Sequence, residues 1–324
     1  MSSYILIQYT SFPIYRMNNL VPAPQITSVL TELRSRNRIL SAIALAHLAL
    51  AGLFTVLMAL DGRTLLGRNV WTKPWKFAIS IAIFTATMAW ILPSLSLTDR
   101  VEKLATYTIS GAMTVEIVLI SAQAARGVAS HFNTSTPLDT TVFMIMGATI
   151  TISSSVVAYV LWRVIRNPPD LPPAYLWGLG LGMFLFVVMS FQGWLMVFRQ
   201  SHAVSAPNDG PGLTLLNWSL TGGDLRIAHL VGLHALQALP LTGYLATRWT
   251  RVSTRGALAL VGIVSVLYGG LTAATFVLSL LGTPLMSTPI VPWLSPSILA
   301  GFLLLVTVGG FVLGTALWKR GTAV

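Results

Sequence analysis

The chain has 324 residues, of which 54% are hydrophobic and only 9% are charged, and its mean hydropathy is +0.75. Soluble domains carry about 25% charged residues, so the composition excludes an ordinary soluble protein and predicts an all-α integral membrane protein. The net charge of +11 does not indicate nucleic acid as a partner, because the basic residues lie in short stretches between apolar runs. The absence of cysteine excludes disulfides and thiolate metal sites.

Residues 1–38 precede the first long apolar run. They lack the charged start, apolar core and small-residue cleavage site of a signal peptide. We expect them to form a cytoplasmic N-terminal segment, which begins at either Met1 or Met17.

Eight apolar runs follow, and each is long enough to cross the roughly 30 Å hydrocarbon core of a bilayer as a helix. They cover residues 39–60, 74–95, 104–125, 141–162, 175–198, 225–246, 256–281 and 294–318. The sequence therefore predicts a single transmembrane domain, 39–318, built as a bundle of about eight helices. These patterns do not set the oligomeric state.

The orientation of the bundle follows from its basic residues. An N-terminus on the inside places thirteen of the 20 Lys and Arg residues in the cytoplasm and seven outside. The positive-inside rule therefore predicts that both termini are cytoplasmic. Short loops and the lack of a targeting signal favour the cytoplasmic (inner) membrane of a bacterium. Residues 199–224 are then a long extracytoplasmic loop, of the kind that often serves as a lid or binding segment.

The run 225–246 is unusual because His229, His234 and Gln237 lie within a stretch apolar enough to span the membrane. Polar side chains at that depth are costly and usually face a bundle interior, a cavity or a partner. Small residues around them let a neighbouring helix or a flat ligand approach closely. These residues are Ala228, Gly232, Ala235 and Ala238.

Polar groups gather toward the outer half of the membrane in this orientation. Glu116 is the only acidic residue well inside an apolar run, and a buried acid is expensive unless it has a partner. Cations at the outer mouth would attract an anionic group. We therefore expect a ligand pocket, open to the outside, that is lined by Lys76, Gln123, Arg126, His131, Gln192, Arg199, His229 and Gln237. The alternative is that each polar group is satisfied locally by a carbonyl or a neighbouring helix.

Asp139 and Asp224 are predicted to cap the helices that follow them, because each stands just before an apolar run. A weak similarity relates residues 121–147 to residues 190–232, with a Ser-x-Gln and a Ser-His in each. It is compatible with a duplicated two-helix unit, as found among transporters, and also with chance.

Three functions fit these residues. The first is a permease or solute-binding protein for a small anionic solute, with Glu116 and His234 as a proton-responsive pair. The second is a b-type haem redox protein, in which His47 and His234 ligate the iron from similar depths. The third is a membrane-embedded enzyme for a lipid or isoprenoid, with Glu116 as a catalytic acid and His234 as a candidate base. A structural or assembly partner without a ligand is the remaining alternative.

A metal site is not predicted. His229 and His234 are five residues apart, which turns their side chains about 140° away from each other on a helix. The chain also has no HExxH motif and no pair of histidines four residues apart.

Overall fold

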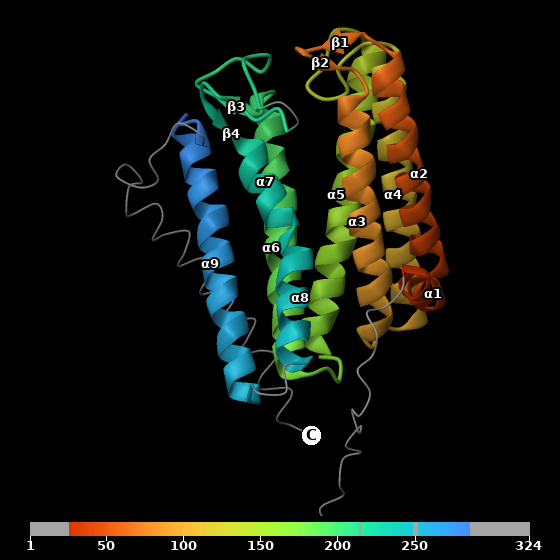
Figure 1. Ribbon diagram of the computed structural model, residues 1–324, viewed down its shortest axis with the longest axis vertical. Coiled ribbons are helices and arrows are strands. Elements are labelled where there is room, and N and C mark those ends of the chain that lie inside the picture. The colour runs from red at the N-terminus through yellow and green to blue at the C-terminus, as the bar shows by residue number, and fades with distance from the viewer. Residues whose placement is uncertain (1–25, 214–215, 249–251, 286–324) are drawn as a thin grey trace, which may run out of the picture.

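The computed structural model describes residues 26–213, 216–248 and 252–285. Within these ranges the chain is mainly helical, with two short antiparallel strand pairs (Figure 1). The helices that are long and apolar enough to cross a membrane are α2 (Arg38–Leu60), α3 with its 3-10 extension η1 (Thr72–Ser94), α4 (Asp99–Ala125), α5 (Pro137–Arg166), α6 (Pro173–Arg199) and α9 (Thr254–Leu280). The chain is therefore a helical protein of the multi-pass membrane class.

The other elements are shorter. They are α1 (Ile26–Arg36), α7 (Leu225–Leu233), α8 (Ala235–Arg248), the pair β1 (Thr64–Leu65) and β2 (Arg68–Asn69), and the pair β3 (Ala203–Val204) and β4 (Gly223–Asp224). Both strand pairs lie at the same end of the bundle, which we call the hairpin end (Figure 1). The opposite end, where α1 precedes α2, is the α1 end.

The predicted span 225–246 is two helices instead of one. Regular helical hydrogen bonding is interrupted around His234, so that α7 ends at Leu233 and α8 begins at Ala235, although the His234 backbone keeps right-handed helical angles and its N–H still donates to the Leu230 carbonyl. Six residues later α8 contains Pro240, which has no N–H to donate to the preceding turn. The Tyr268 hydroxyl of α9 donates to the Val231 carbonyl near the break, at 2.6 Å. The predicted span 225–246 is therefore helical but irregular at one residue, and the predicted span 294–318 lies outside the described residues.

The start of α5 corrects a second prediction. Thr136, and not Asp139, caps this helix: the Thr136 hydroxyl accepts from the Asp139 N–H at 3.1 Å. The Asp139 carboxylate in turn accepts from the Thr136 hydroxyl at 2.7 Å. Pro137 occupies the first helical position, where its missing N–H costs nothing. This reciprocal capping arrangement starts the helix at Pro137, before the predicted position 141.

The long helices form two groups that stand side by side (Figure 1). In one group, α2 packs on α3 and α4 on α5; in the other, α6 packs on α7 and α8, and α9 covers all three. The two groups meet mainly where α5 packs against α6. We call the boundary between them the junction.

Two glycines of α6 bring its backbone against that of α8. A Cβ atom added to Gly178 would stand 2.3 Å from the Leu239 carbonyl oxygen, and one on Gly182 would stand 2.6 Å from that of Ala235. Small residues at such spacing let membrane helices pack backbone to backbone. The close packing predicted around Gly232 is confirmed, because a Cβ there would stand 2.2 Å from Cγ of Met189. This packing fixes α7 and α8 against α6 and so positions the histidines of the candidate site.

Candidate functional site

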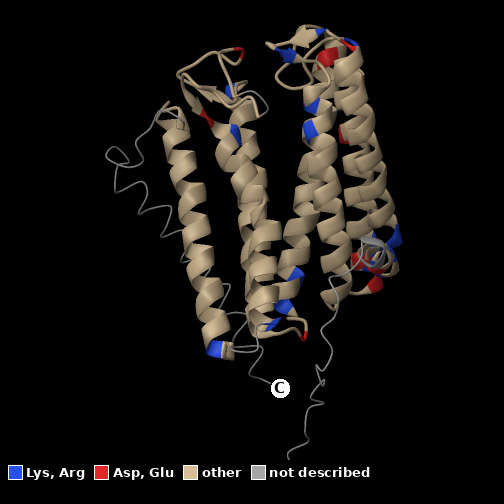
Figure 2. Cartoon of the chain, viewed as in Figure 1, with Lys and Arg blue, Asp and Glu red and all other residues tan. Residues whose placement is uncertain are grey.

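Basic residues of both groups lie beside the junction near the hairpin end (Figure 2). Lys73 and Lys76 lie in the first turns of α3, and Arg226 lies in the first turn of α7. The charges of Lys73 and Lys76 both interact with that of Arg226, and Lys76 also interacts with Arg68, which belongs to β2. We call these four residues the cation cluster.

Three of the four cations bind main-chain carbonyl groups of the loop between α6 and α7. Arg68 donates to the Gly212 carbonyl and, at 3.3 Å, to the Asn217 side chain. Lys76 donates to the Leu216 carbonyl at 3.1 Å, and Arg226 donates to the Asn217 carbonyl. The bonds of Arg68 and Lys76 connect this loop of one group to β2 and the start of α3 in the other. They use neutral oxygen atoms, so they leave the positive charge of the cluster uncompensated.

Lys73 differs from its neighbours in having no recorded hydrogen bond or ion pair within the described ranges. Its ammonium lies 5.9 Å from the centre of the Phe77 ring, which is an attractive but weak contact for a cation. Lys73 is therefore the basic group that is available to a ligand.

Two acidic residues accompany the cluster. Asp224 is buried and accepts from the Arg226 guanidinium at 2.6 and 2.9 Å and from the Ser219 N–H at 3.0 Å. Burial is the largest single effect and would raise the pKa of Asp224, but the hydrogen bonds and charges of Arg226 and His202 together outweigh it and hold the pKa below its ordinary value. Asp224 also caps α7 by accepting from the Arg226 N–H, which confirms its predicted role.

Glu116 is the second acid, and it lies within α4. It is 4% exposed and accepts from the Thr149 hydroxyl of α5 at 3.0 Å. Its charge interacts with that of Lys73. With both acids ionised, the four basic residues of the cluster still exceed them by two positive charges.

Two histidines join the site from opposite groups. His131, in the loop between α4 and α5, packs between Phe77 and Phe143 with ring centres 5.8 and 6.0 Å away. Burial first, and then the charge of Lys73, hold the pKa of His131 well below its usual range, so the ring is neutral at pH 7. His229 of α7 lies within electrostatic range of His131, and its Nδ1 is 3.2 Å from the Gln192 side-chain oxygen. The structure thus brings together His131, His229 and Gln192, three of the predicted ligand residues.

Other predicted residues lie elsewhere. Arg126 forms an ion pair with Asp139 at 2.8 Å and donates to Gln123, so these groups stabilise the turn between α4 and α5. Arg199 is exposed at the end of α6. Neither arginine belongs to the cation cluster.

Gln237 lies deeper along the junction. Its side-chain nitrogen donates to the Thr87 hydroxyl of α3 at 3.1 Å, and its oxygen is 3.2 Å from Nδ1 of His234. This contact bridges α8 and α3 across the two groups. No hydrogen bond or ion pair connects His234 with Glu116 in the described part of the chain, so the predicted proton-responsive pair is not a contacting pair.

A bis-histidine haem does not fit the surroundings of His47. Its Nδ1 lies 2.8 Å from the Ile43 carbonyl, which would leave Nε2 as the iron ligand. That Nε2 atom is buried and has no hydrogen-bond partner among the described residues, so no open space adjoins it in this structure. The residues described here also contain no cluster of three or more His, Cys, Asp or Glu side chains arranged to hold a metal ion.

Lys73 and Arg68 are functional candidates that the predicted ligand set does not contain. Lys73 is three residues before Lys76, so the two side chains share one face of a helix, and this spacing is a usable signal. Arg68 reaches the cluster only because β1 and β2 turn the chain back before α3, which no local pattern indicates.

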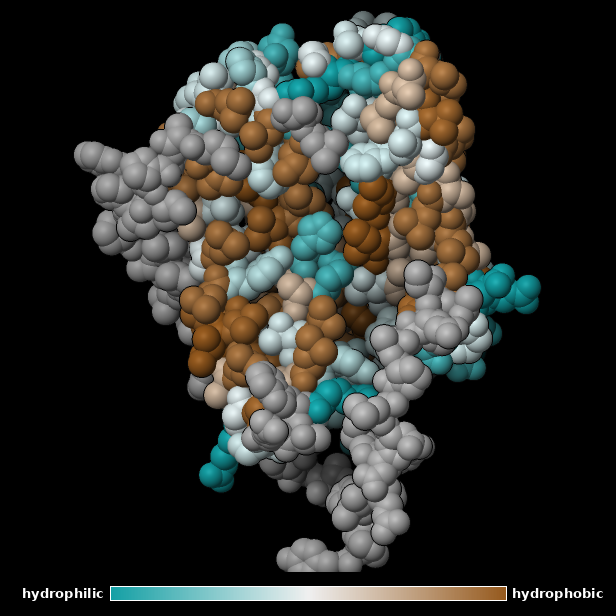
Figure 3. All heavy atoms as spheres, viewed as in Figure 1, coloured by the Kyte–Doolittle hydropathy of each residue, from teal (hydrophilic) through white to brown (hydrophobic). Residues whose placement is uncertain are grey.

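The surface is hollowed between the two groups, and hydrophilic side chains gather at the hairpin end of this furrow (Figure 3). No model of a known protein family matches the chain, and no curated protein or solved structure is significantly similar to it. The interpretation of the site therefore rests on the chemistry of its own residues.

Proposed function

We propose that the protein is a permease or solute-binding protein of the cytoplasmic membrane, and that it takes a small anionic solute at the cation cluster. In the proposed arrangement eight spans leave both termini in the cytoplasm, so the hairpin end is the outer side. The solute enters the junction from that side.

The excess positive charge of the cation cluster is the observation that carries this proposal. Two unit charges of like sign 4 Å apart repel by about 4 kcal/mol at the effective dielectric of a protein surface. An arrangement of four such charges is therefore costly when only two acids accompany it. A bound anion with one or two charges removes the excess. Lys73 has a free ammonium group for it, and neutral His131 and His229 add hydrogen-bonding groups.

Proton coupling is the second part of the proposal, and Glu116 is its centre. The Glu116 carboxylate and a bound anion compete for the same positive charge on Lys73. Binding of the anion and protonation of Glu116 are therefore coupled, as linkage between two sites requires. His234 and Gln237 provide polar groups farther along the junction, toward the α1 end.

A binding experiment tests the anion site. Thermal unfolding of the purified protein is measured with inorganic phosphate, sulfate or acetate, and we expect at least one anion to stabilise it. A ligand at a hundred times its Kd stabilises by about 2.7 kcal/mol. Lys73→Gln should remove this stabilisation, whereas Lys103→Gln, an exposed lysine at the α1 end, should keep it. Equal stabilisation of both variants would contradict the assignment of the site.

An uptake experiment then separates transport from binding. Proteoliposomes containing the protein should accumulate the stabilising anion faster when the outside is more acidic than the inside. Glu116→Gln should abolish this pH dependence while anion binding persists. Intact pH dependence in Glu116→Gln would refute the coupling mechanism. Binding without any uptake would identify a solute-binding protein instead of a permease.

A further inference from the structure

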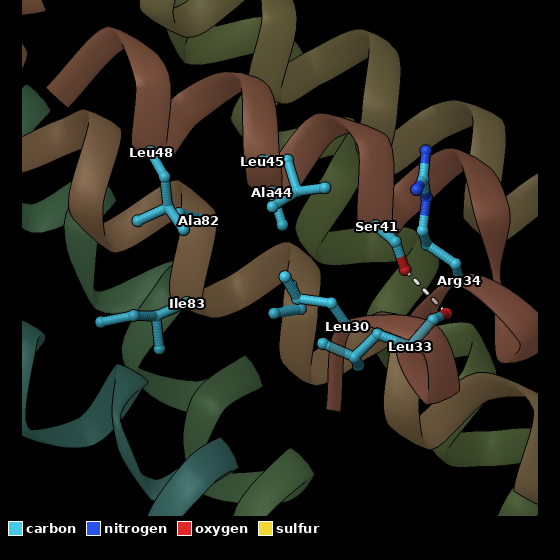
Figure 4. Close-up of a pocket in the computed structure, with 10 residues that line it drawn as sticks. Leu30, Leu33, Arg34, Ser41, Ala44, Leu45, Leu48, Ala82 and Ile83 are labelled. Carbon is cyan, nitrogen blue, oxygen red and sulfur yellow. Dashed lines mark hydrogen bonds between the residues drawn. The ribbon is translucent and has the colours of Figure 1, made fainter. Parts of the chain in front are cut away.

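A second recess lies at the α1 end, between α1, α2 and α3 (Figure 4). It has a volume of about 170 Å³ and almost entirely apolar walls. Six of the residues that line it are Leu30 and Leu33 of α1, Ala44 and Leu48 of α2, and Ala82 and Ile83 of α3. We call this recess the apolar groove.

The groove exists because small side chains leave space between larger ones. Ala44 and Ala82 form its floor and are almost fully buried, whereas Leu48 and Ile83 form an exposed rim at one end. An open apolar surface at the side of a membrane helix faces hydrocarbon chains and not water. The groove therefore has the shape and chemistry to hold an acyl chain.

Specific contacts hold α1 in place as the third wall. The Ser41 hydroxyl of α2 donates to the Leu33 carbonyl at 2.7 Å (Figure 4). Arg36 donates to the Ser94 hydroxyl at 3.2 Å, and its guanidinium lies 4.2 Å from the centre of the Trp90 ring. These bonds fix α1 to both α2 and the end of α3, so the groove is a built feature of the fold.

The charges at the groove select the head group. Arg34 stands at the end opposite Leu48 and Ile83 (Figure 4), and Arg38 begins α2 three residues before Ser41, which also lines the groove. Both arginines are exposed, and the described chain provides neither of them with an ion pair. The nearby acid Glu32 is already neutralised by Arg36 at 2.7 Å. Within the described residues, two arginines without an ion pair therefore lie near the position that the head group of a lipid in the groove would take.

We propose that the apolar groove binds an anionic phospholipid, with one acyl chain between α1, α2 and α3 and the phosphate at Arg34 and Arg38. This site is independent of the cation cluster, because the two lie at opposite ends of the bundle. Arginine suits the role because its planar guanidinium binds phosphate oxygen atoms in pairs.

Native mass spectrometry of the full-length protein, freed of lipid in detergent, tests this proposal. The probes are phosphatidylglycerol and phosphatidylcholine with identical acyl chains. Each basic residue near an anionic head group contributes about fivefold in affinity. We therefore expect phosphatidylglycerol to bind more tightly, and Arg34→Gln and Arg38→Gln each to weaken it about fivefold. Arg100→Gln is the control, because it removes an exposed arginine at the same end but outside the groove.

A second variant isolates the role of the acyl chain. Ala86→Leu fills part of the groove without changing its charge and should weaken both lipids. Equal binding of both lipids to the original protein, or unchanged lipid binding by Ala86→Leu, would overturn the proposal. Displacement of the lipid by inorganic phosphate alone would also overturn it, since it would show a site for a soluble anion. Failure of the anion-stabilisation experiment at Lys73 would leave this inference unaffected.

Discussion

Replacement of Gly178 by alanine should separate α6 from α8. The three atoms nearest to the new Cβ all belong to the backbone of Leu239 and Pro240, and the closest is the Leu239 carbonyl oxygen at 2.3 Å. Ordinary van der Waals contact begins at 3.4 Å, so the helices must move apart by about 1 Å. No flexible side chain can yield instead.

The expected cost follows from this displacement. A gap of 0.5–1 Å already removes about a quarter to a half of the dispersion energy of the atoms on either side. Overpacking typically costs about 1–3 kcal/mol, whereas alanine gains up to about 1 kcal/mol over glycine in a helix. We therefore expect Gly178→Ala to lower the free energy of unfolding by about 1–2 kcal/mol, and Gly182→Ala to have a similar effect.

Unfolding in mixed detergent micelles, followed by tryptophan fluorescence, measures this change. Gly111→Ala and Gly147→Ala are matched controls, because both glycines are helical and a Cβ at either would meet nothing within 4 Å. These controls should be neutral or slightly stabilising. Unfolding free energies of Gly178→Ala at or above those of the controls would refute the argument that α6 and α8 are in backbone contact.

Three further predictions concern named side chains. Asp224→Asn should destabilise the fold by roughly 3 kcal/mol, because it leaves Arg226 partly buried without its counterion. In the unchanged protein this contribution is present at neutral pH and is lost as the pH falls below the ordinary aspartate pKa of 3.8, since the pKa of Asp224 is lowered by folding. Tyr268→Phe should cost about 1 kcal/mol by removing the donor to the Val231 carbonyl. As the pH falls below 6.5, His131 should remain neutral in the folded protein, whereas the unfolded chain takes up a proton there. NMR should therefore show no titration of His131 in the folded protein, and the free energy of unfolding should decrease.

Each of these predictions has a control. Asp209→Asn removes an exposed acid in the same loop as Asp224 and should leave the free energy of unfolding unchanged. Tyr107→Phe removes a hydroxyl that is exposed on α4 and should also leave the free energy of unfolding unchanged. Lys73→Gln should raise the pKa of His131 toward its usual range, and an unchanged pKa would show that the charge of Lys73 does not reach the imidazole.

The apolar runs predicted the long helices well, because a membrane helix is defined by the length and composition of one continuous segment. The start of α5 was predicted wrongly, although Thr136 and Asp139 stand three residues apart, which is the spacing of a capping arrangement. The interruption between α7 and α8 at His234 could not be predicted from the sequence. It lies in an uninterrupted apolar run, and the contacts that accompany it come from α9 and α6, which are distant in sequence.

The residues of the candidate site were predicted from their depth in the membrane, and this criterion identifies only some of them. Lys76, His131 and His229 were expected at one end of the bundle; there Lys73 lies within electrostatic range of Lys76 and His131, and His131 lies within electrostatic range of His229. Arg126 lies at the same end but pairs with Asp139. Depth in the membrane follows from the position in a span, whereas the direction of a side chain around the bundle depends on which helices pack together. A single sequence does not contain that information.

The interruption at His234 has a mechanical consequence. A continuous helix behaves as a stiff rod, so a displacement at one end moves the other end as well. Here the α7 part is attached to Asp224 and α9, while the α8 part is pressed against the glycines of α6. A helix that is irregular at one residue transmits a displacement less rigidly than a regular one, although both parts also pack on α6. The irregular position lies within one turn of Gln237, the residue that bridges the two groups.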